Sequence, residues 1–194
     1  SKIHSTGVST QNGIHQILHA KKTGLSVSFS VTPYHGYFCD EDLKDYDTNL
    51  KLNPPLRTVT DKEAVQKALS DGMVDCIASH HIPLHKDYKD CEFEYAKCGM
   101  NGLQTAFGAI NSFHQHLEIL IRQLTIAPRT IFGLDMPLLE PGAKACLTLF
   151  NPALEYYFEK GALLSKSSNT AFDGKKLKGK VLGILNNQQM VLAK

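Results

Sequence analysis

Three histidines, His80, His81 and His85, fall within six positions of the stretch "IASHHIPLH". Histidine is the commonest protein ligand of transition metals, and a zinc ion so held can activate water near neutral pH. The stretch follows the apolar run "VDCIA", which is typical of a short buried strand. We therefore interpret it as a metal site, or the position of one, at the end of a strand.

Neighbouring residues on a strand point to opposite sides, so His80 and His81 are not expected to bind one ion together. The interpretation that we prefer is that these residues are loop histidines held by hydrogen bonds, at a place where related proteins could bind a metal. His35 follows Pro33 and is predicted to order its loop rather than to transfer protons. Four more histidines are predicted to lie in helices as surface or hydrogen-bonded residues: His15, His19, His114 and His116.

Alternating strands and helices are predicted to position these residues. Residues 2–6 and the alternating stretch "LSVSFSVT" at 25–32 are expected strands, and residues 73–78 form a third. A helix is expected over 11–22, capped by Ser9 or Thr10 and stopped by Gly24. A second is expected over about 60–69, opened by a Thr60–Glu63 capping box and ended at Asp71-Gly72. This order favours parallel strands joined by crossover helices.

The second half of the chain changes character. Residues 102–113 and 116–124 are predicted to be helical. After about Gly133 the runs "AKACLTLF", "KVLGIL" and "QQMVLA" indicate short strands, separated by turns such as Asn186-Asn187. These strands are expected to form a small β appendage.

Composition narrows the class of protein. The chain has 194 residues, enough for one large domain or one domain with a small appendage. Its net charge of +2 does not favour binding to nucleic acid or to an acidic membrane. No stretch approaches the roughly 18 apolar residues of a membrane span, and the first residues lack a signal-peptide pattern. Five cysteines without a CxxC pair favour reduced thiols in a cytoplasmic protein, with Cys76 as a small core residue.

Several stretches, in order along nearly the whole chain, resemble the C-terminal half of class I dihydroorotases, which are cyclic amidohydrolases. "GVSTQNG…SVTPYH" resembles the family's "HVST…VTPHH", and "KLNPPLR" resembles "KxNPPLR". "VDCIASHHIPLH" is similar to "IDxIATDHAPH", and "GMNGLQT" to "GxxGLET". "GAKACLTLFNP" and "SKSSNTAFDGKKLKGKV" resemble the closing segments of the family.

This resemblance implies an α/β fold, the C-terminal part of a (β/α)8 TIM-type amidohydrolase barrel with a small flanking β-sandwich appendage. Residues 1–132 would belong to the barrel and residues 133–194 to the appendage. Active family members hydrolyse the cyclic amide dihydroorotate in pyrimidine biosynthesis. Zinc activates the attacking water, and an aspartate takes its proton.

The chemistry-bearing positions depart from the family pattern. By resemblance, Gly7 stands where the family has a zinc-ligating histidine, and His80 where it has the catalytic aspartate. Leu84 replaces a histidine that binds the substrate carboxylate, whereas Asn53 matches a substrate-contacting asparagine. We therefore expect no intact catalytic residue and no metal or other cofactor at these positions.

The preferred hypothesis is a dihydroorotase-like protein that has lost zinc hydrolysis and keeps a structural or regulatory role. The alternative is an active zinc-dependent cyclic amidohydrolase with altered ligands. By family analogy the suspected partner is aspartate carbamoyltransferase. Three strands cannot close a barrel, so the edge near residues 2–6 and apolar inner strand faces at 25–31 and 74–78 are expected to be bare. Association with a second copy or with the missing N-terminal half would cover them.

Overall fold

The computed structural model describes residues 1–193, and its first half is built on a parallel sheet. The strands are β1 (Ile3–Ser5), β2 (Val27–Val31) and β3 (Cys76–Ile77), in the order β1-β2-β3. Both pairings are parallel, with His4 opposite Ser28 and Ser30 opposite Cys76. The predicted parallel arrangement is confirmed, although each strand is shorter than expected.

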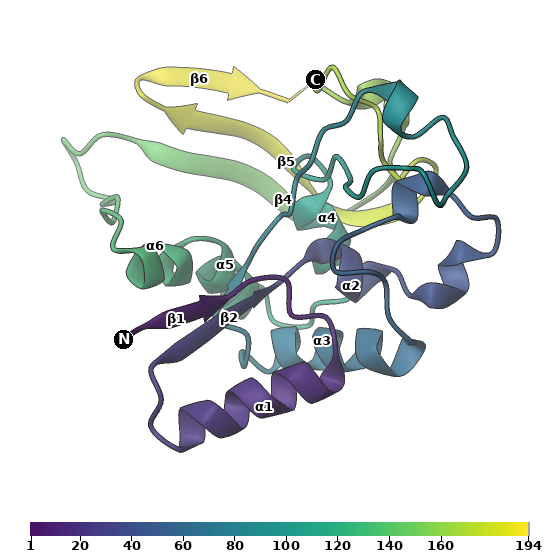
Figure 1. The fold of residues 1–194 in the computed structure, drawn as a ribbon. Helices are drawn as coiled ribbons and strands as arrows, with labels where there is room; N and C mark the ends of the chain where they lie inside the picture. The colour runs from purple at the N-terminus through teal and green to yellow at the C-terminus, as the bar shows by residue number, and fades with distance from the viewer. Residues whose placement is uncertain (194) are drawn as a thin grey trace.

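Two helices cover one face of this sheet (Figure 1). Helix α1 (Gln11–Lys22) begins where the Thr10 side chain accepts a hydrogen bond from the Gly13 backbone, as predicted. Helix α3 (Val59–Ser70) ends at Asp71, also as predicted, but the expected Thr60–Glu63 capping box is wrong. The cap is Thr58, which accepts from the Asp61 backbone and donates to its carboxylate.

Long segments follow the carboxyl ends of β2 and β3. After β2 come the short helix α2 (Pro33–Tyr37) and the 3-10 turns η1 (Asp40–Leu43) and η2 (Thr48–Leu50). After β3 comes η3 (Lys86–Tyr88), and an isolated parallel bridge joins His81 to Met100. These segments carry most of the residues that the sequence singles out.

Three helices precede the second sheet: α4 (Ala106–Asn111), α5 (Leu117–Leu124) and α6 (Ile126–Phe132). The first two were predicted, and α6 was not. His114 and His116 lie between α4 and α5, so their predicted placement in helices is wrong. At this turn the ring of His114 forms a hydrogen bond of 3.1 Å with the carbonyl of Leu69, near the end of α3.

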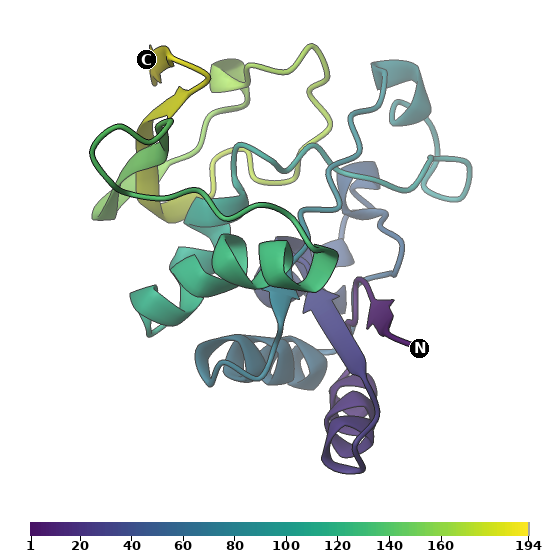
Figure 2. The same cartoon turned by 90° about the vertical axis from the view of Figure 1, so that its left-hand side faces the viewer.

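An antiparallel sheet forms the other end of the molecule (Figure 2). It consists of β4 (Cys146–Tyr157), β5 (Lys176–Asn186) and β6 (Gln189–Leu192), with η4 (Lys160–Ala162) between β4 and β5. The turn before β6 places Asn187 and Gln188 at φ values of 48° and 63°. The predicted strands are confirmed. The sandwich form and the boundary at residues 132/133 stay predictions.

Two apolar cores hold these parts together. The first lies between the parallel sheet and helices α1, α3 and α5, and includes Phe29, Val31 and Val74. The second joins the loops after β2 to the antiparallel sheet through residues such as Tyr34, Phe172 and Leu177. Phe29 and Val31 are fully buried, so the expectation of bare apolar faces on β2 and β3 is wrong. None of the helices in residues 1–193 has the length and apolar character that a membrane crossing requires.

Candidate functional site

His80 and Gly7 lie against one another at the carboxyl ends of β3 and β1. An ideal Cβ at Gly7 would be 2.5 Å from Cε1 of His80, 3.3 Å from its Nε2 and 3.2 Å from Cδ of Pro54. Gly7 has φ of +72°, a conformation that L side chains rarely adopt. The imidazole of His80 therefore fills the space that a side chain at Gly7 would need.

Hydrogen bonds hold the His80 ring in this place. Its Nε2 shares a hydrogen bond of 2.9 Å with the Thr6 hydroxyl. Burial lowers the pKa of His80, and the Asn53 backbone acts in the opposite direction. The backbone carbonyl of His80 accepts a hydrogen bond from the hydroxyl of Tyr34, in the helix that follows β2, at 3.4 Å. His80 thus connects the segments that follow all three parallel strands.

The other two histidines of the stretch point elsewhere. Nδ1 of His81 accepts a hydrogen bond from the backbone amide of Gly102 at 3.2 Å. The backbone amide of Leu103 lies 3.4 Å from the same nitrogen. His85 is exposed and pairs with Asp87 at 3.1 Å. The rings of His80 and His81 thus face different partners. That they bind no common ion stays a prediction.

His35 orders the loop that contains Pro54 and Pro55. Its Nε2 lies 3.0 Å and 3.2 Å from their carbonyl oxygens, and its Nδ1 lies 2.7 Å from the Thr32 hydroxyl. The residue is buried, and burial lowers its pKa, with the carbonyls acting in the opposite direction. A neutral ring whose nitrogens face fixed partners positions a loop, as the sequence predicted.

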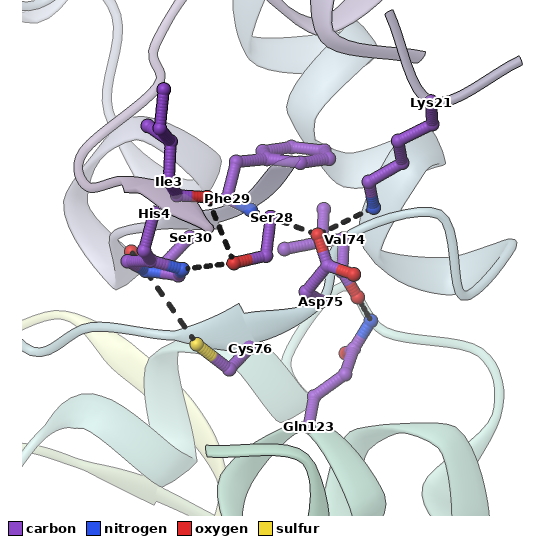
Figure 3. Close-up of polar contacts among 10 residues, drawn as sticks. All are labelled: Ile3, His4, Lys21, Ser28, Phe29, Ser30, Val74, Asp75, Cys76 and Gln123. Carbon is purple, nitrogen blue, oxygen red and sulfur yellow. Dashed lines mark hydrogen bonds and ion pairs between the residues drawn. The ribbon is translucent and has the colours of Figure 1, made fainter. Parts of the chain in front are cut away.

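The sheet face that α1 and α3 leave uncovered is polar. His4 shares hydrogen bonds with the hydroxyls of Ser28 at 2.8 Å and Ser30 at 3.2 Å (Figure 3). Ser30 in turn donates to Thr6 at 3.0 Å, and Thr6 contacts His80. The face therefore carries one continuous hydrogen-bonded chain, instead of the apolar surface that was expected. Alternation along "LSVSFSVT" already contains this signal, because its serines occupy every second position.

Known proteins resemble this chain in sequence. No family model matches it. A dihydroorotase from Caldanaerobacter subterraneus subsp. tengcongensis is 39% identical over 186 residues, which are 93% of this chain and 43% of that protein. A dihydroorotase from Citrifermentans bemidjiense is 36% identical over 193 residues, which are 97% of this chain and 46% of that protein.

The chain is homologous to a part of the dihydroorotases. It spans less than half the length of these relatives and corresponds to their C-terminal part. The resemblance stated from the motifs is thereby confirmed.

Solved structures give the same fold. The L-hydantoinase of Arthrobacter aurescens superimposes with a TM-score of 0.88 at 21% identity, over 98% of this chain and 45% of that one. The inactive dihydroorotase-like domain of a Chaetomium thermophilum CAD-like multifunctional protein gives 0.72 at 18% identity, over 100% of this chain and 54% of that one. At such identities the likeness shows only that this chain shares its fold with the corresponding part of these proteins, and the barrel form stays a prediction.

Among the described residues, Gly7 and His80, at the positions of the family's zinc-ligating histidine and catalytic aspartate, do not fit an ion. A catalytic zinc needs about three protein ligands with nitrogen, sulfur or oxygen donors. Gly7 offers no side-chain donor, and Nε2 of His80 is engaged by Thr6. Within residues 1–193 no group of three or more His, Cys, Asp or Glu side chains is placed to hold a metal.

The two substrate positions of the dihydroorotase pattern lie on the loops around His80. Asn53 is exposed and precedes Pro54. Leu84 is half-buried, and its backbone amide donates to the Asn169 side chain at 3.0 Å. Their proposed substrate role, kept at Asn53 and lost at Leu84, stays a prediction.

Sequence reasoning missed Asp75. Its carboxylate lies 2.5 Å from Nζ of Lys21 and accepts the backbone amide of Phe29 at 2.8 Å (Figure 3). The only available signal was a single acidic residue inside the apolar run "MVDCIA". Through these two contacts, Asp75 links α1 to the parallel sheet.

Proposed function

We propose that this chain is part of a dihydroorotase-like protein that does not hydrolyse dihydroorotate and has a structural or regulatory role. The observation that carries the proposal is the close approach of His80 to Gly7. At Gly7 the dihydroorotase pattern requires a metal-ligating imidazole, and at His80 it requires a carboxylate that accepts the proton of the attacking water. An imidazole hydrogen-bonded to Thr6 supplies neither.

The structural likeness to an inactive dihydroorotase-like domain supports this proposal, because that protein combines the fold with loss of activity. Its description as part of a multifunctional protein also supports a role within a larger assembly. By family analogy we propose aspartate carbamoyltransferase as partner, pyrimidine biosynthesis as setting and the cytoplasm as location.

A second candidate is an active, zinc-dependent cyclic amidohydrolase with altered ligands that converts dihydroorotate and water to N-carbamoyl-aspartate. It is favoured by the names of the relatives, which are called dihydroorotase at 36–39% identity. For this candidate, ligands outside the present chain would have to compensate for Gly7.

One assay separates the two candidates. The full-length protein is tested for interconversion of dihydroorotate and N-carbamoyl-aspartate, with and without added zinc, beside an active dihydroorotase as positive control. We expect no turnover above the protein-free rate in either condition. Zinc-dependent turnover that a chelator abolishes would establish the second candidate.

Retention of aspartate carbamoyltransferase on immobilised protein tests the proposed partner separately.

A further inference from the structure

His80 has an unusual backbone conformation at the place where three strand ends meet. Its φ of +42° lies in the left-handed region, which few non-glycine residues occupy. Such a conformation persists where surrounding contacts determine it, and it often marks a residue with a special role. The contacts here are those of the ring, whose Nε2 bonds Thr6, and of the backbone carbonyl, which accepts a hydrogen bond from the Tyr34 hydroxyl.

The His80 ring and the residues around it come from three separate parts of the chain. Thr6 and Gly7 follow β1, Asn53 and Pro54 lie in the long segment after β2, and His80 follows β3. Thr6 also receives a hydrogen bond from Ser30 in β2. The segments that extend from this edge of the sheet therefore meet at His80.

We infer that the imidazole of His80 is a fixed tie between the ends of β1 and β3, packed beside the loop at Pro54, and that the absence of a side chain at Gly7 makes room for it. The tie holds these loops by hydrogen bonds and packing, in place of an ion at the same position. That the ring stands where related proteins hold an ion rests on the proposed function, whereas the tie itself does not.

The inference makes Gly7 and His80 mutually dependent. A methyl group at Gly7 would displace the ring and break its bond to Thr6, because the added Cβ lies 2.5 Å from Cε1. With a smaller residue at position 80, the same methyl group would meet only the strain of its positive φ and the contact with Pro54.

Gly174 is the matched control. Its φ of +69° is close to the +72° of Gly7, and an added Cβ there meets nothing within 4 Å. Gly174→Ala thus measures the backbone strain alone. His80→Asn is the second variant, because asparagine tolerates the left-handed region better than most residues.

The experiment compares melting temperatures of the full-length protein with Gly7→Ala, Gly174→Ala, His80→Asn and the double change Gly7→Ala with His80→Asn. We expect Gly7→Ala to lower the Tm by roughly 2–4 °C more than Gly174→Ala does. In the His80→Asn background this excess should disappear. If Gly7→Ala does not fold, recovery of a cooperative melt in the double variant supports the tie in the same way, and no recovery overturns it.

An equal effect of Gly7→Ala with histidine or asparagine at position 80 would overturn the inference. So would a Tm that rises with added zinc chloride in the wild type and no longer does so in His80→Asn, because His80 would then be a metal ligand. We expect neither zinc chloride nor a chelator to shift the Tm. Dihydroorotase activity alongside the expected melting pattern would refute the proposed function and leave the tie intact.

Discussion

Nζ of Lys21 in α1 lies 2.5 Å from the carboxylate of Asp75, the residue immediately before β3. The same carboxylate accepts the amide of Phe29, a fully buried residue of β2. One side chain thus fixes a helix and two segments of the sheet together. Both charged side chains are about a quarter exposed, with 27% of each accessible, so the hydrogen bond to the backbone contributes more than the ion pair.

We therefore predict that Asp75→Ala lowers the free energy of unfolding by about 1.5–3 kcal/mol, because a hydrogen-bonded charged acceptor is lost. Lys21→Met keeps the apolar stem and removes only the ion pair, so it should cost about 1 kcal/mol or less. Urea denaturation of both variants measures the difference. Equal losses would show that the ion pair, and not the bond to Phe29, dominates.

The second prediction concerns pH and His35. Burial lowers the pKa of this histidine in the folded protein, so the unfolded chain binds the proton first as pH falls. The contribution to stability is complete above the unfolded pKa of about 6.5 and is lost progressively below it, by at most about 1.4 kcal/mol per pH unit for one group. Denaturation should thus become easier between about pH 7 and pH 5.

His35→Gln removes the titrating group and should make the dependence of stability on pH shallower. His4, His80 and His114 also have lowered pKa values, so part of the dependence should remain. The measurement is urea denaturation of wild type and variant at matched pH values. An unchanged slope in the variant would contradict the assignment to His35.

The third prediction tests the metal positions directly. Gly7→His alone should destabilise the protein, because the new side chain would collide with the His80 ring. The double change Gly7→His with His80→Asp removes the collision and restores the residue types of the dihydroorotase pattern. We expect it to bind zinc, by titration calorimetry, only if further ligands lie elsewhere in the full-length protein. Zinc binding by the double variant without such ligands would show that the positions are misassigned.

The fourth prediction is that the isolated 194-residue chain does not persist as a stable monomer. Strand β1 is at an edge of its sheet, where unpaired backbone groups can accept another strand. The antiparallel sheet also leaves large apolar side chains exposed on both faces, at Leu147, Leu149, Leu182, Ile184, Met190, Val191 and Leu192.

Size-exclusion chromatography with light scattering is the measurement. We expect oligomers or aggregates, and a cooperatively melting monomer near 21.5 kDa would contradict the prediction. Leu149 and Leu192 lie on one face, because both are in register with Gly183. Changing both to Glu should reduce association if this sheet drives it, and should have little effect if the β1 edge does.

Local structure was largely readable from the sequence. The cap at Thr10, the alternation of residues 27–31 and the turn before Gln189 each depend on neighbouring residues only, and the structure has each of them. The expected Thr60–Glu63 cap is wrong for a local reason, since Thr58 and Asp61 offer an equivalent hydroxyl and carboxylate pair two residues earlier. The motifs also identified the dihydroorotase family, because they recur in order along the chain.

Contacts between distant segments were decided by the tertiary structure. The sequence shows a glycine at position 7 and a histidine at position 80, but only the parallel register of β1, β2 and β3 brings the His80 ring into the space beside Gly7. The contacts of Asp75 with Phe29 and of His114 with the carbonyl of Leu69 likewise join segments that are far apart in the sequence. Local propensity depends on near neighbours, whereas these contacts depend on how sheet and helices pack, which neither spacing nor composition determines.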